Sequence, residues 1–322
     1  MPLLEPLLPL HQAQQAGGAE LSPDLINDFR AAAHAAHRSA VIPLYGPPAD
    51  GIAVTEHTAT RTDGPEVAVR VYRPRADEVL PGYLYLHGGG FWAGEAELFD
   101  VPCGRIARDA HCVVISVDYG LAPENPFPGP VDDCYAALLW VHANAAQLGV
   151  DADRIALGGA SAGGGLAAAV ARLARDNHGP EILLQVLEVP AVDLRPESLV
   201  RIDPEGAPLQ VDGMAQAADL YIRPPHRADD PLASPGLAAD LQGLPPALVM
   251  TAEYDPLRAG GEHYARRLEA AGVPVTHHLW LGQLHGSQRF ETLIPEPAAR
   301  YHAIVVEALA GALHPCAAEA GR

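Results

Sequence analysis

The chain contains no lysine: all 21 of its basic residues are arginine. A Ser-Lys dyad, a Schiff-base enzyme, a pyridoxal-phosphate site and a phosphate-binding loop each need the lysine amine. Arginine cannot replace it, because the guanidinium group stays protonated in proteins. These mechanisms are therefore excluded, and histidine remains as the side chain that could activate a hydroxyl nucleophile.

Cysteine is scarce, and its four residues lie far apart, at Cys103, Cys112, Cys134 and Cys316. No Cys-x-x-Cys spacing occurs among them. The pattern therefore indicates neither a zinc site nor a redox pair, and we expect no metal and no cofactor.

The sequence also has no run of the roughly 20 apolar residues that a bilayer-spanning helix needs. Residues 1–20 carry no basic residue ahead of their short apolar stretch, so the signal-peptide pattern is missing. The formal net charge is −19, and such a surface repels phosphate backbones and anionic lipid headgroups. We expect a cytoplasmic protein with reduced thiols that binds neither nucleic acid nor a membrane.

The length of 322 residues and the hydrophobic content of 48% are sufficient for one large core, so we expect a single domain over 1–322. Apolar and alternating segments predict strands near 52–60, 66–73, 82–86, 113–117, 154–158, 183–189, 246–251 and 274–280. From the third strand onward, a predicted helical segment lies between each strand and the next. This alternation predicts an α/β fold with a mostly parallel eight-stranded sheet and helices on both faces.

Two segments fall outside the alternation. Helix-prone residues 24–40 precede the first strand, and residues 195–240 are rich in proline around one helical stretch at 212–221. A long insertion in a compact domain is usually a lid or disordered. We expect a helical cap contributed by about 1–45 and about 195–240.

The most informative motif is Gly159-Ala160-Ser161-Ala162-Gly163, which lies between a predicted strand and an alanine-rich helix. A serine raised on such a tight turn is a candidate nucleophile, and it needs neighbours with almost no side chain. The motif alone is weak evidence in a chain this rich in glycine and alanine. Whether Ser161 is catalytic therefore depends on the other motifs in the chain.

Three further loops contain residues that could act together with Ser161. His87-Gly88-Gly89-Gly90 follows the strand at 82–86, Asp255 follows the strand at 246–251, and His285 follows the strand at 274–280. The order serine, acid, histidine along the chain is the order that α/β-hydrolases use.

The sequence resembles the hormone-sensitive-lipase-like esterases of the α/β-hydrolase superfamily, from about residue 45 to the C-terminus. The motifs that carry the resemblance are His87-Gly88-Gly89-Gly90-Phe91, Asp118-Tyr119-Gly120-Leu121-Ala122-Pro123-Glu124, Gly159-Ala160-Ser161-Ala162-Gly163-Gly164, Asp255-Pro256-Leu257-Arg258 and His285-Gly286. The resemblance implies an α/β-hydrolase fold, a helical cap, a homodimer, and hydrolysis of carboxylic esters with short or medium acyl chains.

The sequence departs from the family pattern at four places. Ala160 replaces the usual Asp, Gly120 replaces Arg, Ser287 replaces Phe, and Ala259-Gly260 replaces an acidic pair. These changes leave the expected triad untouched, so they bear on substrate range and turnover rather than on reaction class.

The expected mechanism uses Ser161 as nucleophile, His285 as general base and Asp255 to orient the histidine. The expected oxyanion donors are the backbone N–H groups of Gly88, Gly89 and Ala162. Water then hydrolyses the acyl-enzyme, and the partner is a small-molecule ester.

The sequence is compatible with several alternatives. Glu253 is close enough in sequence to replace Asp255 as the acid, and His34 and His37 have an i, i+3 spacing that could suit a metal, although no third ligand is recognisable. The chain could also be a ligand-binding protein on a hydrolase scaffold, as in the gibberellin receptors, although such receptors lose the triad histidine. A dinucleotide-binding fold needs G-x-G-x-x-G, which Ala160 interrupts.

Overall fold

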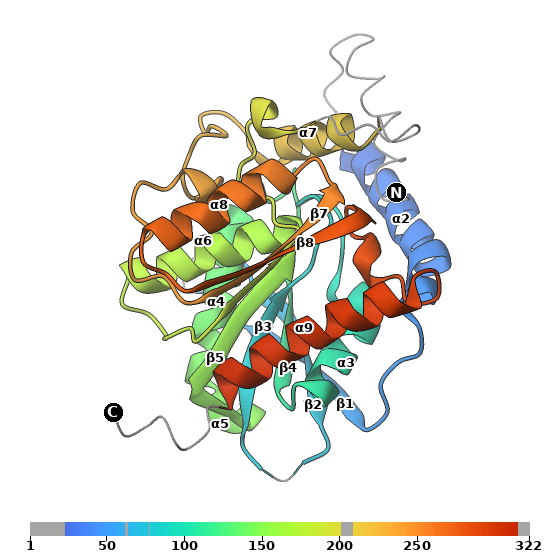
Figure 1. Cartoon of the computed structure of the whole chain (residues 1–322), viewed down its shortest axis with the longest axis vertical. Coiled ribbons are helices and arrows are strands. Elements are labelled where there is room, and N and C mark those ends of the chain that lie inside the picture. The colour runs from blue at the N-terminus through green and yellow to red at the C-terminus, as the bar shows by residue number, and fades with distance from the viewer. Residues whose placement is uncertain (1–22, 62–63, 77, 201–208, 315–322) are drawn as a thin grey trace.

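One eight-stranded sheet organises the chain, in the order β1-β2-β4-β3-β5-β6-β7-β8 (Figure 1). The computed structural model describes residues 23–61, 64–76, 78–200 and 209–314. The strands are β1 (Ile52–Ala59), β2 (Val67–Pro74), β3 (Leu80–Leu86), β4 (Val113–Asp118), β5 (Val150–Ala160), β6 (Gln185–Glu188), β7 (Ala247–Tyr254) and β8 (Val275–Leu284). All eight predicted strands are confirmed.

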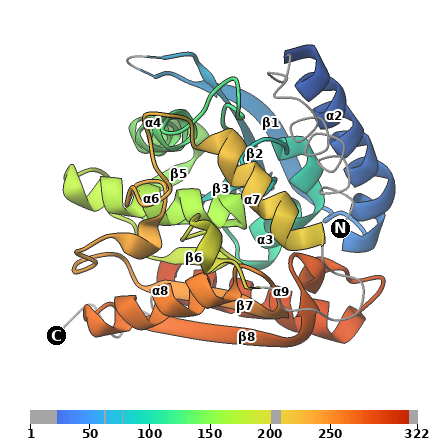
Figure 2. The same cartoon turned by 90° about the horizontal axis from the view of Figure 1, so that it is seen from above.

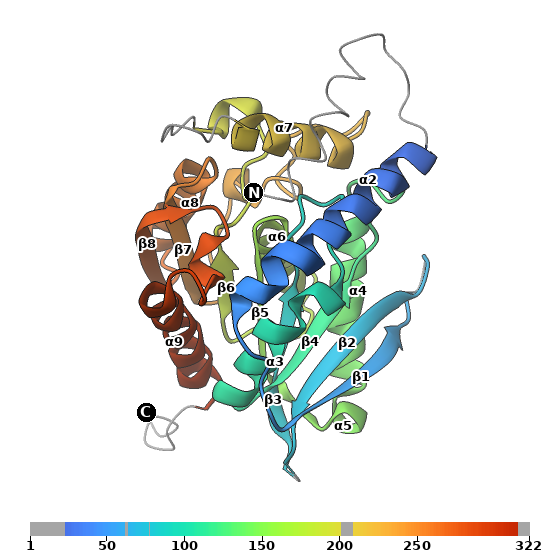
Figure 3. The same cartoon turned by 90° about the vertical axis from the view of Figure 1, so that its right-hand side faces the viewer.

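The sheet is parallel from β3 onward, and only the pairs β1–β2 and β2–β4 are antiparallel. Strands β1 and β8 form its two edges, on opposite sides of the molecule in Figure 3. The predicted mostly parallel arrangement is therefore confirmed. It brings the carboxyl ends of β3, β5, β6, β7 and β8 to one edge of the sheet, where α/β proteins place their sites.

Helices cover both faces of the sheet because both faces of its central strands are apolar. On β3, Leu84 and Leu86 belong to one apolar core, while Tyr83 and Tyr85 belong to the other. Helices α4, α6 and α8 lie on the first face, and α3 and α9 lie on the second (Figures 1 and 3). The helices are α2 (Pro23–Ala36), α3 (Asp100–Asp109), α4 (Gly129–Ala143), α5 (Ala145–Leu148), α6 (Ala162–Asp176), α7 (Leu209–Tyr221), α8 (Arg258–Ala270) and α9 (Pro295–Leu313).

Helices α2 and α7 lie over the carboxyl ends of the strands, as the view from above shows (Figure 2). Helix α2 continues into a π-helical turn at His37–Val41 and a 3-10 turn at Ile42–Tyr45. The α-helix predicted at 24–40 thus ends at Ala36, but the helical segment continues to Tyr45, because Pro43 lies in the first turn of the 3-10 helix, where proline is tolerated. Residues 1–22 and 201–208 of the predicted cap lie outside the described residues.

Within the described part of the chain, every helix is too short or too polar to cross a lipid bilayer. Cys103, Cys112 and Cys134 are buried free thiols, and Cys316 lies outside the described residues.

Candidate active site

Ser161 occupies the single residue between the end of β5 and the start of α6. Its backbone has φ 56° and ψ −118°, a conformation that L residues rarely adopt. The turn closes against β3, since a Cβ atom at Gly159 or Gly163 would overlap the carbonyl oxygen of Leu86. Glycine at both positions therefore allows the turn to lift the serine hydroxyl above the sheet.

The structure brings His285 and Asp255 to this serine. The Nε2 atom of His285 lies 2.9 Å from the Ser161 Oγ, and its Nδ1 atom lies 2.8 Å from the Asp255 Oδ2. The other carboxylate oxygen of Asp255 accepts the Leu257 N–H at 2.9 Å. Asp255 is fully buried and His285 is 5% exposed, so the contacts are shielded from solvent.

The glycine loop after β3 borders the same serine. A Cβ atom at Gly88 would lie 3.0 Å from the Ala160 carbonyl oxygen and 3.5 Å from the Ser161 Cβ, so the bare backbone of Gly88 approaches the serine closely. Gly89 has φ +143°, which favours glycine. Ala162 begins helix α6, where N–H groups have no partner within the helix. Among the described residues, none of these three N–H groups donates a hydrogen bond to the backbone.

His87 supports the loop rather than facing the serine. Its Nδ1 lies 3.0 Å from the Gly88 carbonyl oxygen, and its ring stacks on Tyr119 with centroids 4.3 Å apart. The Tyr119 hydroxyl donates to the His87 carbonyl oxygen at 2.8 Å. Burial lowers the pKa of His87 to about 4, which keeps the imidazole neutral at pH 7.

The alternative site residues have other partners. The Glu253 carboxylate accepts the Gly282 N–H at 2.6 Å, whereas Asp255 is the acid beside His285. His34 accepts the Gly94 N–H at 3.0 Å, and His37 pairs with a tyrosine hydroxyl. In the described ranges, no group of three His, Cys, Asp or Glu side chains is placed to hold a metal ion.

Sequence reasoning missed a buried ion pair next to the site. Arg289 follows His285 by four residues, and its Nε lies 3.1 Å from the carboxylate of Glu188 at the end of β6. Its Nη1 donates to the Tyr85 hydroxyl at 2.8 Å, and the Tyr301 hydroxyl donates to the same carboxylate. The Glu188 side chain is 1% exposed and that of Arg289 is 10% exposed.

The ion pair of Glu188 and Arg289 connects the strands that position Ser161 and the glycine loop. The Ser161 N–H donates to the Glu188 carbonyl oxygen at 2.8 Å, and Tyr85 lies on the strand that leads into the glycine loop. The available sequence signal was the charge of Glu188 within the apolar run 182–192, because a buried carboxylate needs a cation nearby.

Two cavities meet at Ser161. The larger has a volume of about 110 Å³ and is bounded by His285, the glycine loop, the segment after α2, and α7. The smaller has a volume of about 30 Å³, and its walls include Phe91, Leu194 and Leu257. The larger cavity lies on the His285 side, and the lining of the smaller one does not include that histidine.

Known proteins show the same organisation. The sequence pattern of the alpha/beta hydrolase fold matches residues 83–289. An arylesterase of Saccharolobus solfataricus is 40% identical over 243 residues, which cover 74% of this chain and 78% of the relative. Carboxylesterase NlhH of Mycobacterium tuberculosis is 41% identical over 239 residues, which cover 72% of this chain and 75% of that protein.

The crystal structure of a hyperthermophilic esterase from the archaeon Pyrobaculum calidifontis is similar to the chain with a TM-score of 0.80 and 37% identity, over 94% of this chain and 97% of that one. Sequence pattern, relatives and fold agree with the resemblance carried by the motifs. The chain belongs to the α/β-hydrolase family, in its hormone-sensitive-lipase-like branch.

Proposed function

We propose that the protein is a carboxylesterase that cleaves short- to medium-chain esters through an acyl-enzyme. The observation that carries the proposal is the continuous chain of hydrogen bonds from Ser161 through His285 to the buried Asp255. Relatives named as esterases, at 40% and 41% identity, support it. The intact histidine argues against a non-catalytic binding protein on the same scaffold.

In the first half of the reaction, His285 takes the Ser161 proton at Nε2 while the serine oxygen attacks the ester carbonyl carbon. Asp255 accepts a hydrogen bond from the Nδ1–H of His285 and stabilises the imidazolium that forms, without taking the proton itself. The imidazolium then protonates the leaving alcohol, and the acyl group remains on Ser161.

In the second half, His285 removes a proton from water, which attacks the acyl-enzyme. The tetrahedral intermediate collapses, the proton returns to the serine oxygen, and the carboxylic acid leaves. Apart from the ester and water, every group in these steps belongs to this chain.

The oxyanion of both intermediates would lie among the N–H groups of Gly88, Gly89 and Ala162. Each such donor is typically worth about 2.7–4 kcal/mol of barrier. The close approach of Gly88 to Ser161 and the position of Ala162 at the start of α6 support this assignment, since a helix N-terminus favours negative charge.

The two cavities support an assignment of the alcohol and acyl portions of the ester to separate pockets. The leaving alcohol must lie near the group that protonates it, so the larger cavity beside His285 receives the alcohol portion. The acyl group then enters the smaller apolar cavity. A volume of about 30 Å³ favours a short acyl chain.

We also propose that α2 and α7 belong to a cap within a single domain. Val41, from the turn after α2, lines the larger cavity, and Ala217 of α7 lines both cavities, which supports a role in substrate range. The homodimer stays a prediction, for which the edge strand β8 offers a surface.

The test is ester hydrolysis by matched variants. Purified protein should hydrolyse p-nitrophenyl acetate, and Ser161→Ala and His285→Ala should each lower kcat by at least about 10³-fold while circular dichroism stays unchanged. Ser39→Ala, at an exposed serine, is the control and should keep full activity. An active Ser161→Ala variant would place the chemistry elsewhere.

A further inference from the structure

Apart from Ser161 and His285, the larger cavity, which receives the alcohol portion, has one polar pair in a largely apolar wall. His37 and Tyr45 both line the cavity, and the Tyr45 hydroxyl lies 3.2 Å from the His37 Nε2. The apolar side chains around them include Val41, Trp92 and Phe290. His37 is 2% exposed and Tyr45 is 6% exposed, so whatever they bind is shielded from bulk water.

The pair has hydrogen-bonding capacity left over. Burial lowers the pKa of His37 to about 4 and raises the pKa of Tyr45 to about 12, so at pH 7 the pair carries one N–H and one O–H. One of these hydrogens lies between the two side chains. In either imidazole tautomer, one donor and one acceptor remain for a third group. Within the described residues, neither side chain makes a second hydrogen bond that would use them.

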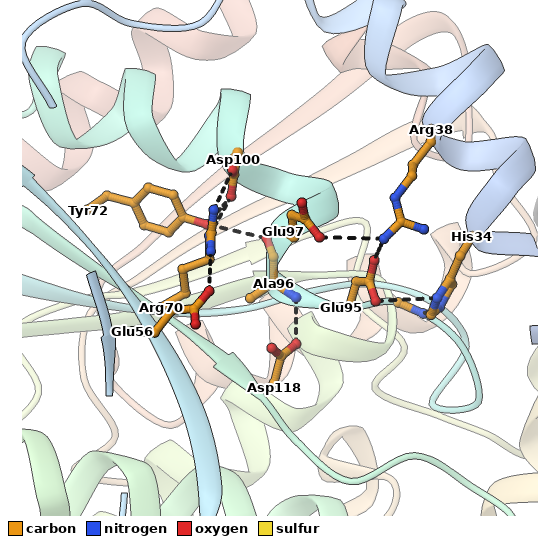
Figure 4. Close-up of polar contacts among 11 residues, drawn as sticks. His34, Arg38, Glu56, Arg70, Tyr72, Glu95, Ala96, Glu97, Asp100 and Asp118 are labelled. Carbon is orange, nitrogen blue, oxygen red and sulfur yellow. Dashed lines mark hydrogen bonds and ion pairs between the residues drawn. The ribbon is translucent and has the colours of Figure 1, made fainter. Parts of the chain in front are cut away.

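The segment that carries the pair is held firmly against the body of the protein. One turn before His37, the ring of His34 accepts the Gly94 N–H at 3.0 Å. Arg38 binds the carboxylate of Glu95, as Figure 4 shows. The polar pair therefore has a fixed position in the cavity, as selection among substrates requires.

We propose that His37 and Tyr45 form a specificity site for a hydroxyl group in the alcohol portion of the ester. A hydroxyl can donate or accept, so it can form a hydrogen bond with the Tyr45 oxygen in either imidazole tautomer of His37. The preferred substrates are then short-chain monoesters of diols or of similar hydroxylated alcohols. This inference rests on the proposed esterase function and on the assignment of the larger cavity to the alcohol.

The test compares pairs of acetate esters of equal size. Each pair replaces a terminal CH₃ of the alcohol by OH: propyl against 2-hydroxyethyl, butyl against 3-hydroxypropyl, and pentyl against 4-hydroxybutyl acetate. The measured quantity is the ratio of kcat/KM for the hydroxylated ester to that for its alkyl partner. For at least one pair, Tyr45→Phe and His37→Phe should each lower this ratio about five- to tenfold, as expected for one hydrogen bond.

Tyr45→Phe removes a single oxygen atom, so it keeps the proposal testable even if His37→Phe unfolds. The matched control is His263→Phe, at an exposed histidine of α8, which should leave the ratio unchanged. Ratios that are equal in wild type and Tyr45→Phe for all three pairs would overturn the specificity site while leaving the esterase proposal intact. Wild-type protein that hydrolyses none of the six esters would overturn the proposed function, and the specificity site with it.

Discussion

Arg289→Met should be one of the most destabilising substitutions near the site. The change leaves the carboxylate of Glu188 buried without its cation, since only 1% of that side chain is exposed. Removing one partner of a buried ion pair costs about 3–5 kcal/mol. The Tyr85 hydroxyl also loses its donor at 2.8 Å, so the upper half of that range is expected.

The assay is urea unfolding of four proteins: wild type, Arg289→Met, Glu188→Met and the double variant. Replacing both partners removes both charges, so the double variant should be considerably more stable than the sum of the single losses predicts, with a coupling free energy of about 3 kcal/mol. Arg227→Met is the control, because Arg227 pairs with Asp229 at the surface and is 77% exposed. This variant should unfold at the same urea concentration as the wild type. If Arg289→Met unfolded at the same urea concentration as this control, the buried ion pair would not stabilise the protein as proposed.

Three other predictions concern the serine turn, the acid of the hydrogen-bond chain and the buried His87. Gly163→Ala should lose stability and activity, because its Cβ would overlap the backbone of β3, whereas Gly311→Ala, with open space in α9, should gain up to about 1 kcal/mol in thermal unfolding. Asp255→Asn should lower kcat about 10⁴-fold, but Glu253→Gln should retain most of the activity in the same ester assay. Burial lowers the pKa of His87 from 6.5 to about 4, so the unfolded chain binds more protons between these values and stability falls as the pH drops. Urea unfolding at pH 7.5 and pH 5 should show a loss of about 2 kcal/mol from His87 and a similar loss from His37, whose pKa burial also lowers to about 4; equal stability at the two pH values would contradict this prediction.

The sheet could be predicted from the sequence because its signals are local. Each central strand is a short apolar run bounded by turn residues, as at 113–117 and 246–251, and burial on both faces produces such runs. The helix at 24–40 was harder to bound, since Pro43 suggested an end where the chain continues as a 3-10 turn to Tyr45.

The three residues of the Ser161 hydrogen-bond chain could be predicted because each follows a strand within a recognisable motif. The pair of Glu188 and Arg289 could not, because the partners are 101 residues apart and no motif links them. The same holds for the larger cavity, to which His37 and Phe290 come from opposite ends of the chain. Contacts of this kind depend on tertiary packing, which local patterns do not encode.

The nucleophile is identified most directly by covalent labelling with an organophosphonate ester, followed by intact-mass measurement and peptide mapping. We expect one adduct per chain, located on Ser161, with no labelling of Ser161→Ala and much slower labelling of His285→Ala. An adduct on another residue, or equal labelling of Ser161→Ala, would contradict the claim that Ser161 is the nucleophile.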